Sequence, residues 1–133
     1  MNPIRYALNA SLTTEAVVRV FNNAGITRPT HDTVRIAQMF ANANLVVSAW
    51  DGDHLVGVAR ALSDFCYCCY LSDLAVDAAY QRQGIGSALI TQVRHAVGDG
   101  VSLILLSAPG AMGYYPKVGF TAADNAFVIK RQA

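Results

Sequence analysis

The fold of this chain is decided by one stretch, Leu74-Ala75-Val76-Asp77-Ala78-Ala79-Tyr80-Gln81-Arg82-Gln83-Gly84-Ile85-Gly86-Ser87-Ala88-Leu89. Its apolar start predicts a strand, and the apolar spacing after Gly86 predicts a helix. Gly84 and Gly86 fall where the loop becomes the helix, so successive backbone N–H groups can face one concavity beside the positive end of the helix dipole. A Cβ at either glycine would push an anion off those N–H groups. The stretch therefore predicts a phosphate-binding loop.

Two common nucleotide-binding motifs do not fit this spacing. A Rossmann fingerprint begins immediately after its strand and has a third Gly or Ala where this chain has Leu89, whereas Gly84 follows Val76 by eight residues. A P-loop requires Gly-Lys-Ser or Gly-Lys-Thr, which the sequence lacks. Both motifs are therefore excluded by spacing and composition.

The pattern Gln81-x-x-Gly84-x-Gly86, preceded by the strand Leu71 to Val76, closely resembles the pyrophosphate loop of the GCN5-related N-acetyltransferase (GNAT) family. In that family the backbone N–H groups of the loop bind the pyrophosphate of acetyl-CoA. The preceding strand offers main-chain groups to the pantetheine arm, beside a bulge that separates it from the next parallel strand. The resemblance assigns the pyrophosphate to Gln81, Arg82, Gln83, Gly84, Ile85, Gly86 and Ser87, and the pantetheine to Leu74, Ala75 and Val76.

A second stretch supports the same family. The segment Ala111-Met112-Gly113-Tyr114-Tyr115-Pro116-Lys117-Val118-Gly119-Phe120 resembles the family pattern Ala-x-x-Phe-Tyr-x-Lys-x-Gly-Phe. By this resemblance Tyr115 stands near the CoA sulfur and protonates the departing thiolate; a phenol with a reference pKa of about 10 is protonated at neutral pH. The alternative is that Tyr115 is a core aromatic residue. Tyr114, about 100° away around a helix, is expected to pack inward.

The chain departs from the family pattern in two places. Many members carry Asn three residues before the Ala of the second segment, where this chain has Ala108 followed by Pro109. Only thirteen residues follow Phe120, enough for one strand and hardly for a closing hairpin. We therefore expect a shortened C-terminal wall, which a second subunit of a homodimer can complete.

Hydrophobic periodicity predicts an α+β fold, in the order strand, helix, helix, three antiparallel strands, helix, strand, short helix, strand. The resemblance implies a GNAT-like three-layer arrangement: a mixed, mostly antiparallel sheet with a splayed central parallel pair and flanking helices. Residues 1–133 are expected to form one acetyltransferase domain. The predicted elements are Ile4 to Leu8, Ser11 to Ala24, Thr30 to Ala43, Leu45 to Trp50, Leu55 to Leu62, Tyr67 to Val76, Gly86 to Gly98, Val101 to Ser107, Ala111 to Val118 and Phe127 to Lys130.

An acceptor amine must lose a proton before it attacks a thioester, and Asp73 is the first candidate for the general base. It interrupts an apolar strand just before the residues assigned to pantetheine, where burial would raise the pKa of a carboxylate. Two alternatives remain open: Asp73 satisfies backbone groups freed at the bulge, or water takes the proton.

The family places the acceptor pocket between the first two helices, their connecting loop and the central strands. This implies candidates Asn23, Arg28, His31, Arg60 and Asp64. Arg28 and Arg60 are suited to a substrate carboxylate, or they are solvated surface charges. The sequence does not show which of these residues bind the acceptor. It also does not show whether the acceptor is a small-molecule amine or a peptide amine.

Composition excludes several other partners. A formal net charge of +1 gives no basic field for nucleic acid and no polybasic patch for an anionic membrane. No apolar run reaches the roughly 18 residues that cross a bilayer, and the N-terminus lacks a signal-peptide pattern. We therefore expect a cytoplasmic protein without nucleic-acid or membrane partners.

Three cysteines, Cys66, Cys68 and Cys69, crowd into four residues and cannot staple distant segments through disulfides. They also lack the spacing of a zinc site, so no metal is expected. We interpret them as small core residues.

The sequence as a whole predicts an acetyl-CoA-dependent N-acetyltransferase in which a primary amine attacks the thioester directly in a ternary complex. The alternative is a non-catalytic acyl-CoA-binding sensor or scaffold that retains the loop without turnover.

Overall fold

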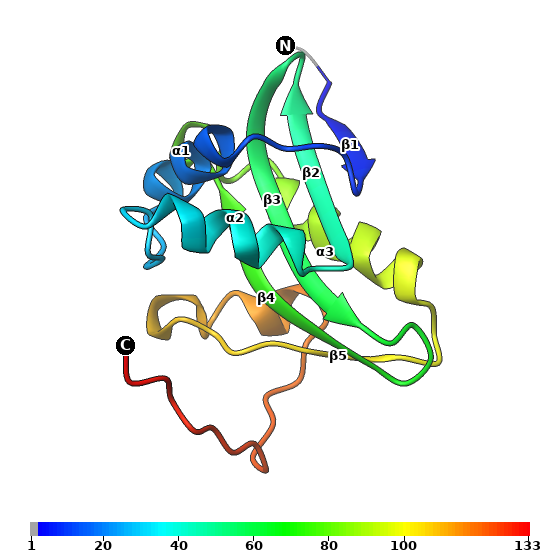
Figure 1. Ribbon diagram of the computed structural model, residues 1–133. Helices are drawn as coiled ribbons and strands as arrows, with labels where there is room; N and C mark the ends of the chain where they lie inside the picture. The colour runs from blue at the N-terminus through cyan, green and yellow to red at the C-terminus, as the bar shows by residue number, and fades with distance from the viewer. Residues whose placement is uncertain (1–2) are drawn as a thin grey trace.

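The computed structural model describes residues 3–133 and builds one mixed sheet flanked by helices on both faces (Figure 1). The strands lie in the order β1-β2-β3-β4-β5; β1 to β4 pair antiparallel, and β4 and β5 pair parallel. The strands are β1 (Arg5–Leu8), β2 (Leu45–Asp51), β3 (His54–Ser63), β4 (Cys68–Val76) and β5 (Ser102–Ile104), and the helices are α1 (Thr14–Ala24), α2 (Thr33–Ala41) and α3 (Ile85–Val97). This confirms the predicted α+β fold with one parallel crossover.

The helices bury their apolar stripes on opposite faces of the sheet. On one face α1 and α2 pack Phe21 and Ile36 against β2 and β3, and on the other α3 packs Leu89 and Val93 against β2, β3 and β4; all four side chains are fully buried. Within residues 3–133, none of the helices is long and apolar enough to cross a membrane.

Local residues set the ends of the N-terminal elements. The Thr13 hydroxyl accepts a hydrogen bond from the Ala16 N–H at 3.1 Å and caps α1, which ends at Gly25 in the left-handed conformation (φ 76°). The β2–β3 hairpin turns through Gly52 at φ 60°, as the Asp-Gly pair predicts. These turns bring β3 beside β4, where the site forms.

A bulge in β4 separates the two central strands. Arg60 of β3 pairs with Asp73, but the next residue, Ala61, pairs with Leu71, so Ser72 is an extra residue in β4. The parallel pairing of β4 with β5 ends at Tyr70 and Ile104. Beyond that point the two strands are not paired, which confirms the splayed parallel pair.

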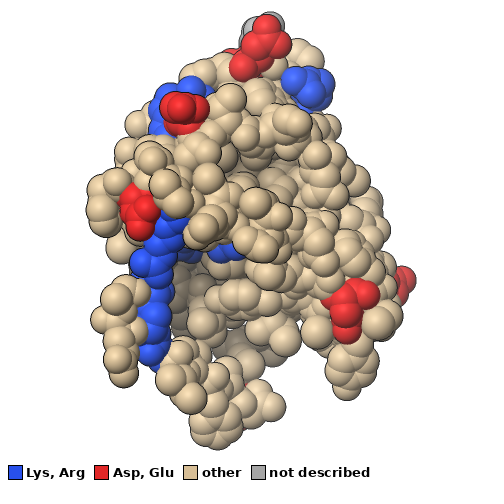
Figure 2. Space-filling model, viewed as in Figure 1, with Lys and Arg blue, Asp and Glu red and all other residues tan. Residues whose placement is uncertain are grey.

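The prediction of a C-terminal strand over Phe127 to Lys130 was wrong. The chain from 120 to 133 forms no strand, and the side chains of Phe127 and Ile129 are almost fully exposed. The end of the tail lies near α2, where Arg35 Nη2 donates to the Ala133 carbonyl at 3.3 Å. A β pattern makes a strand only when a neighbouring strand accepts its hydrogen bonds, and this tail lies apart from the sheet (Figures 1 and 2).

Two neighbouring elements are also shorter than expected. The strand predicted over Val101 to Ser107 is limited to β5, because its outer edge has no partner strand among the described residues. The helix predicted over Ala111 to Val118 is replaced by two 3₁₀ turns, Pro109–Ala111 and Tyr115–Val118. Pro116 lacks the N–H that a continuous α-helix requires in its interior.

Only one of the three cysteines is a core residue as predicted. Cys69 is buried on β4, whereas Cys66 is exposed in the turn before β4 and Cys68 is exposed at its first residue, and all three are free thiols. The Asp64 carboxylate organises this turn by accepting the N–H groups of Cys66, Tyr67 and Cys68 at 2.8–3.0 Å. A turn with this side-chain acceptor exposes residues that an apolar pattern places in a strand.

Candidate active site

The phosphate-binding loop forms where β4 ends and α3 begins. Asp77 caps the 3₁₀ turn Ala78–Tyr80 by accepting the Ala79 N–H at 3.0 Å, and the Gln81 amide donates to the Val76 carbonyl at 2.8 Å. No side chain caps the N-terminus of α3. The first N–H groups of a helix lack partners within it, so those of α3 are left without a side-chain acceptor, an arrangement that suits an anion.

The two glycines of the loop serve different purposes. Gly84 has φ 83°, a left-handed conformation that side chains disfavour, and a Cβ built there meets no other atom within 4 Å. Gly86 has an ordinary φ, but a Cβ built there lies 2.8 Å from the Tyr114 hydroxyl oxygen. Gly84 therefore sets the path of the chain, and Gly86 leaves room over the helix end.

A cavity of about 450 Å³ opens over this loop and contains most of the predicted cofactor residues. Its walls also include residues that the sequence analysis did not assign, from the turn after Ala78 and from the segment after Ala108. The predicted lining residues are Leu74, Val76, Gln81, Arg82, Gly84, Ile85, Gly86, Ser87 and the predicted acid Tyr115, and the added ones are Tyr80, Gly110, Ala111 and Tyr114. Two predicted residues do not line the cavity: Gln83 is exposed beside it, and the Ala75 side chain points into the core under α1.

Tyr114 corrects an expectation. Its side chain does not pack inward but is 37% exposed, with its hydroxyl over Gly86. The reason is that the segment is a 3₁₀ turn, in which neighbouring side chains project differently than on the expected α-helix. No signal in the sequence shows which way the side chains of Tyr114 and Tyr115 point.

Tyr115 lies at the junction of two cavities. It lines the cavity over the loop and a second cavity of about 290 Å³ beside β5, formed by Leu103, Leu105, Phe120 and the start of the tail. Its ring makes edge contacts with Tyr114 and Phe120, at centroid distances of 5.3 and 5.5 Å. Burial and the neighbouring Tyr114 raise the pKa of Tyr115, and the charge of Arg28 partly opposes them. The hydroxyl therefore stays protonated at neutral pH.

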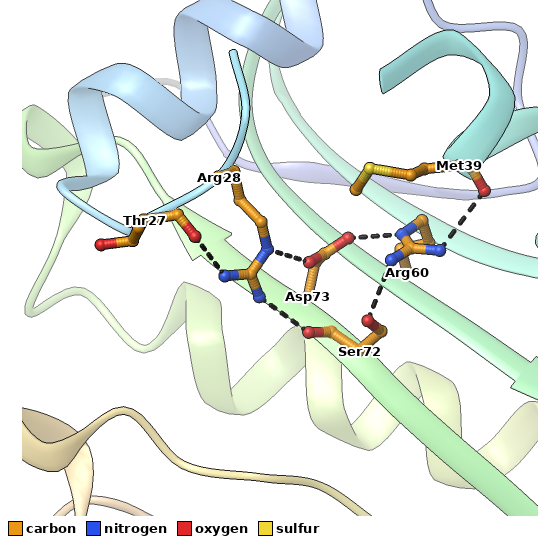
Figure 3. A network of polar contacts seen from close by, with 6 residues as sticks. All are labelled: Thr27, Arg28, Met39, Arg60, Ser72 and Asp73. Atoms are coloured by element: carbon orange, nitrogen blue, oxygen red, sulfur yellow. Dashed lines mark hydrogen bonds and ion pairs between the residues drawn. The ribbon is translucent and has the colours of Figure 1, made fainter. Parts of the chain in front are cut away.

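A polar network surrounds the bulge (Figure 3). The Asp73 carboxylate, 1% exposed, forms ion pairs with Nε of Arg28 through one oxygen and with Nε of Arg60 through the other. Arg28 Nη2 also donates to the Ser72 carbonyl at 2.9 Å, and Arg60 Nη2 donates to the Ser72 hydroxyl at 2.9 Å. The network thus satisfies the extra residue of the bulge and joins the α1–α2 loop to β3 and β4.

These contacts bear on the role of Asp73. Both of its oxygens accept hydrogen bonds from guanidinium groups, which is the arrangement of a carboxylate that holds other side chains in place. The freed carbonyl of the bulge is satisfied by Arg28 rather than by Asp73. The assignment of Asp73 as general base stays a prediction, and its surroundings favour a structural role.

The structure brings together only some of the candidate acceptor residues. Arg28 and Arg60 meet at the bulge, whereas the amide of Asn23 donates to the Asp77 carboxylate at 3.0 Å and fixes α1 to the start of the loop. His31 is exposed between α1 and α2, and Asp64 lies at the opposite end of β4 from the loop. Burial acts to raise the pKa of the Asp77 carboxyl, but the hydrogen bonds from Ala79 and Asn23 outweigh it, so the pKa is lowered.

Comparison with known proteins agrees with this geometry. The family model of the acetyltransferase (GNAT) domain matches residues 11–130. The chain belongs to the GNAT family of acetyltransferases. A curated relative, an uncharacterized ycf52-like N-acetyltransferase of Prochlorococcus marinus, is 30% identical over 65% of this chain and 52% of its own length. The chain spans about half or less of the length of the curated relatives it matches.

Solved structures share the GNAT fold over nearly the whole chain. A Staphylococcus aureus protein of unknown function, described as a probable acetyltransferase, superposes with a TM-score of 0.81 at 23% identity, covering 97% of this chain and all of that one. A GNAT acetyltransferase of Streptococcus pneumoniae superposes with a TM-score of 0.75 at 25% identity, covering 98% and 100%. The predicted family and fold are therefore confirmed.

The first prediction concerns the stability of the bulge. Asp73→Ala leaves the buried guanidinium of Arg60 without its carboxylate, and we expect the free energy of unfolding to fall by about 3–5 kcal/mol in urea denaturation. Asp99→Ala, at an exposed carboxylate after α3, is the matched control and should leave the unfolding midpoint unchanged. A loss below about 1 kcal/mol for Asp73→Ala would show that the network does not hold the fold.

Proposed function

We propose that this GNAT domain is a cytoplasmic enzyme that transfers an acetyl group from acetyl-CoA to a primary amine by direct attack in a ternary complex. The observation that carries the proposal is the position of Tyr115, between the cavity over the phosphate-binding loop and the cavity beside β5. A donor bound over the loop would bring its thioester to this hydroxyl, and an acceptor would reach it through the opening between β4 and β5. The three free thiols are consistent with a reducing compartment.

The residues of the loop fit acetyl-CoA. The uncapped N-terminus of α3 offers N–H groups to a pyrophosphate, and Leu74 and Val76 offer an apolar path for the pantetheine arm. Bound acetyl-CoA supplies an activated thioester. The absence of a side chain at Gly86 lets the Tyr114 hydroxyl lie over the start of α3, beside those N–H groups.

In the proposed mechanism the amine nitrogen bonds to the thioester carbonyl carbon, and the carbon–sulfur bond then breaks. Tyr115 donates its proton to the departing sulfur and regains one from solvent. The acceptor ammonium gives one proton to water before the attack, and the nitrogen gives a second to water as the amide forms, because the two oxygens of Asp73 are held by Arg28 and Arg60. No covalent enzyme intermediate is required.

Calorimetric titration tests the cofactor. We expect acetyl-CoA and CoA to bind with a dissociation constant on the order of micromolar and NAD not to bind. Gly86→Val places a branched side chain against the Tyr114 hydroxyl and over the helix end, so it should weaken acetyl-CoA binding at least about tenfold. Gly100→Ala, in the loop before β5, is the control and should bind normally. Absence of acetyl-CoA binding by the wild type would refute the proposal.

The pH dependence and one substitution test the acid. Since the raised pKa keeps the Tyr115 hydroxyl protonated to higher pH, kcat/KM should rise from pH 6 to 9 as the amine deprotonates, with no fall below about pH 10. Tyr115→Phe should lower kcat about 10²- to 10⁴-fold without changing acetyl-CoA affinity. Tyr67→Phe, at an exposed tyrosine before β4, is the control.

A different outcome would identify the alternative function. If acetyl-CoA binds tightly, yet no amine in a broad panel releases free CoA, the domain is a non-catalytic acyl-CoA-binding sensor or scaffold. The observation that favours this reading is the open side of the cavity beside β5, where the tail does not form a strand.

We also propose that a second copy of the chain completes that open side. Three consecutive apolar residues of the tail, Phe127, Val128 and Ile129, are 55–101% exposed, and the outer edge of β5 exposes Ile104 beside the apolar cavity. An unpaired strand edge is a template for pairing with another chain. The reciprocal exchange of two tails would bury both apolar surfaces in a homodimer.

Size-exclusion chromatography with light scattering measures the mass of the protein in solution and tests this arrangement. A mass of twice 14.2 kDa is expected for the wild type. Substitution of Phe127 and Ile129 by Ser should give the monomer, because it removes the apolar contacts of the tail, whereas Val34→Ser on the outer face of α2 should not. A monomeric wild type would refute the exchange.

A further inference from the structure

We infer that Arg28 binds a carboxylate of the acceptor, so that the substrates are amines that carry a carboxylate group, as free amino acids do. The inference rests on the proposed acetyl transfer and names the chemistry of its second substrate. It comes from the charge, the unused hydrogen-bond donors and the position of the network at the bulge.

The network holds an uncompensated positive charge. Arg60 is 8% exposed and pairs directly with Asp73 across β3 and β4, so these two residues neutralise each other. Arg28 shares the same carboxylate, and within residues 3–133 no other acidic side chain lies within ion-pair distance of it. One positive charge is therefore left at the edge of the buried network, where an anion would be favoured over a cation.

Arg28 has free donors with which to bind that anion. A guanidinium has five N–H donors. Three are used, by Asp73, by the Ser72 carbonyl and by the Thr27 carbonyl. One N–H remains on each terminal nitrogen, and a carboxylate can accept two parallel hydrogen bonds from such a pair. The Arg28 side chain is 29% exposed, whereas that of Arg60 is 10% exposed.

Arg28 also lies on the acceptor side of the reacting centre. It extends from the α1–α2 loop to the bulge, at the place where β4 leaves β5 (Figure 3). Burial raises the pKa of Tyr115, and the charge of Arg28 opposes this effect in part. Lys and Arg side chains follow one side of the hollow in this face, and no acidic side chain is visible inside it (Figure 2).

The same charge disfavours simple amines. A primary amine arrives mainly as ammonium, which Arg28 repels. An amino acid brings a carboxylate that pairs with Arg28 and leaves its amine directed toward the opening beside Tyr115. The substrate preference thus follows from the positive charge of Arg28. The fold requires this charge at the bulge, and the shared carboxylate of Asp73 neutralises it only in part.

Matched acceptors test the inference. The twenty amino acids and their carboxamides differ only in the carboxylate, and CoA release from acetyl-CoA is followed for each pair. We expect kcat/KM for the best amino acid to exceed that for its carboxamide at least about tenfold, the effect of a charge-assisted hydrogen bond. In Arg28→Gln this ratio should fall toward one, while the dissociation constant of acetyl-CoA stays near wild type. Arg28→Lys, which keeps the charge without the fork, should give an intermediate ratio.

Controls separate recognition from folding. Arg5→Gln, on β1 at the opposite edge of the sheet, should leave the ratio unchanged. If Arg28→Gln lowers activity equally with both acceptors, Arg28 only supports the bulge, and the inference is wrong. If the wild type acetylates acid and carboxamide equally, or prefers the carboxamide, the inference fails while acetyl transfer stands. If no amine is acetylated, the proposed function fails with it.

Discussion

The rest of the site depends on the extra residue in β4. Ser72 shifts the register between β3 and β4, and β4 pairs with β5 only before that point. A bulge leaves a backbone carbonyl without its ladder partner. Here that carbonyl belongs to Ser72, and the guanidinium of Arg28 donates a hydrogen bond to it. Two arginines on one buried carboxylate, Asp73, then fix the α1–α2 loop to the sheet. These contacts surround the point where β4 and β5 separate, which is the proposed route of the acceptor.

The loop after β4 uses a second constraint, the unpaired N–H groups at the start of α3. The sheet side of α3 is fully packed, with Leu89 and Val93 buried, so this helix end cannot move without disturbing the core. Gly84 turns the chain into the helix, and Gly86 lets the Tyr114 hydroxyl approach its first turn. The packing of α3 thus positions the proposed anion site before any ligand arrives, which would reduce the ordering that binding requires.

The sequence predicted what depends on nearby residues. The hairpin at Gly52, the cap at Thr13 and the loop at Gly84 each follow from the conformation that a few adjacent residues favour. It did not predict contacts between distant segments: Arg28 and Asp73 are 45 residues apart, and only the fold joins them. The predicted strand over 127–130 was wrong for the same reason, since its β pattern requires a partner edge that the sequence cannot supply by itself.

The ring of Tyr115 lies between the cavity over the loop and the cavity beside β5, and this position bears on the size of the proposed donor. Its edge contacts with Tyr114 and Phe120 fix the ring on both sides. In the proposed mechanism the acyl group ends at this partition, so a longer chain would meet either the ring or the acceptor. The proposed acid would therefore also limit the length of the acyl chain. Enlarging the donor range requires a change at Phe120 or along β5, outside the phosphate-binding loop.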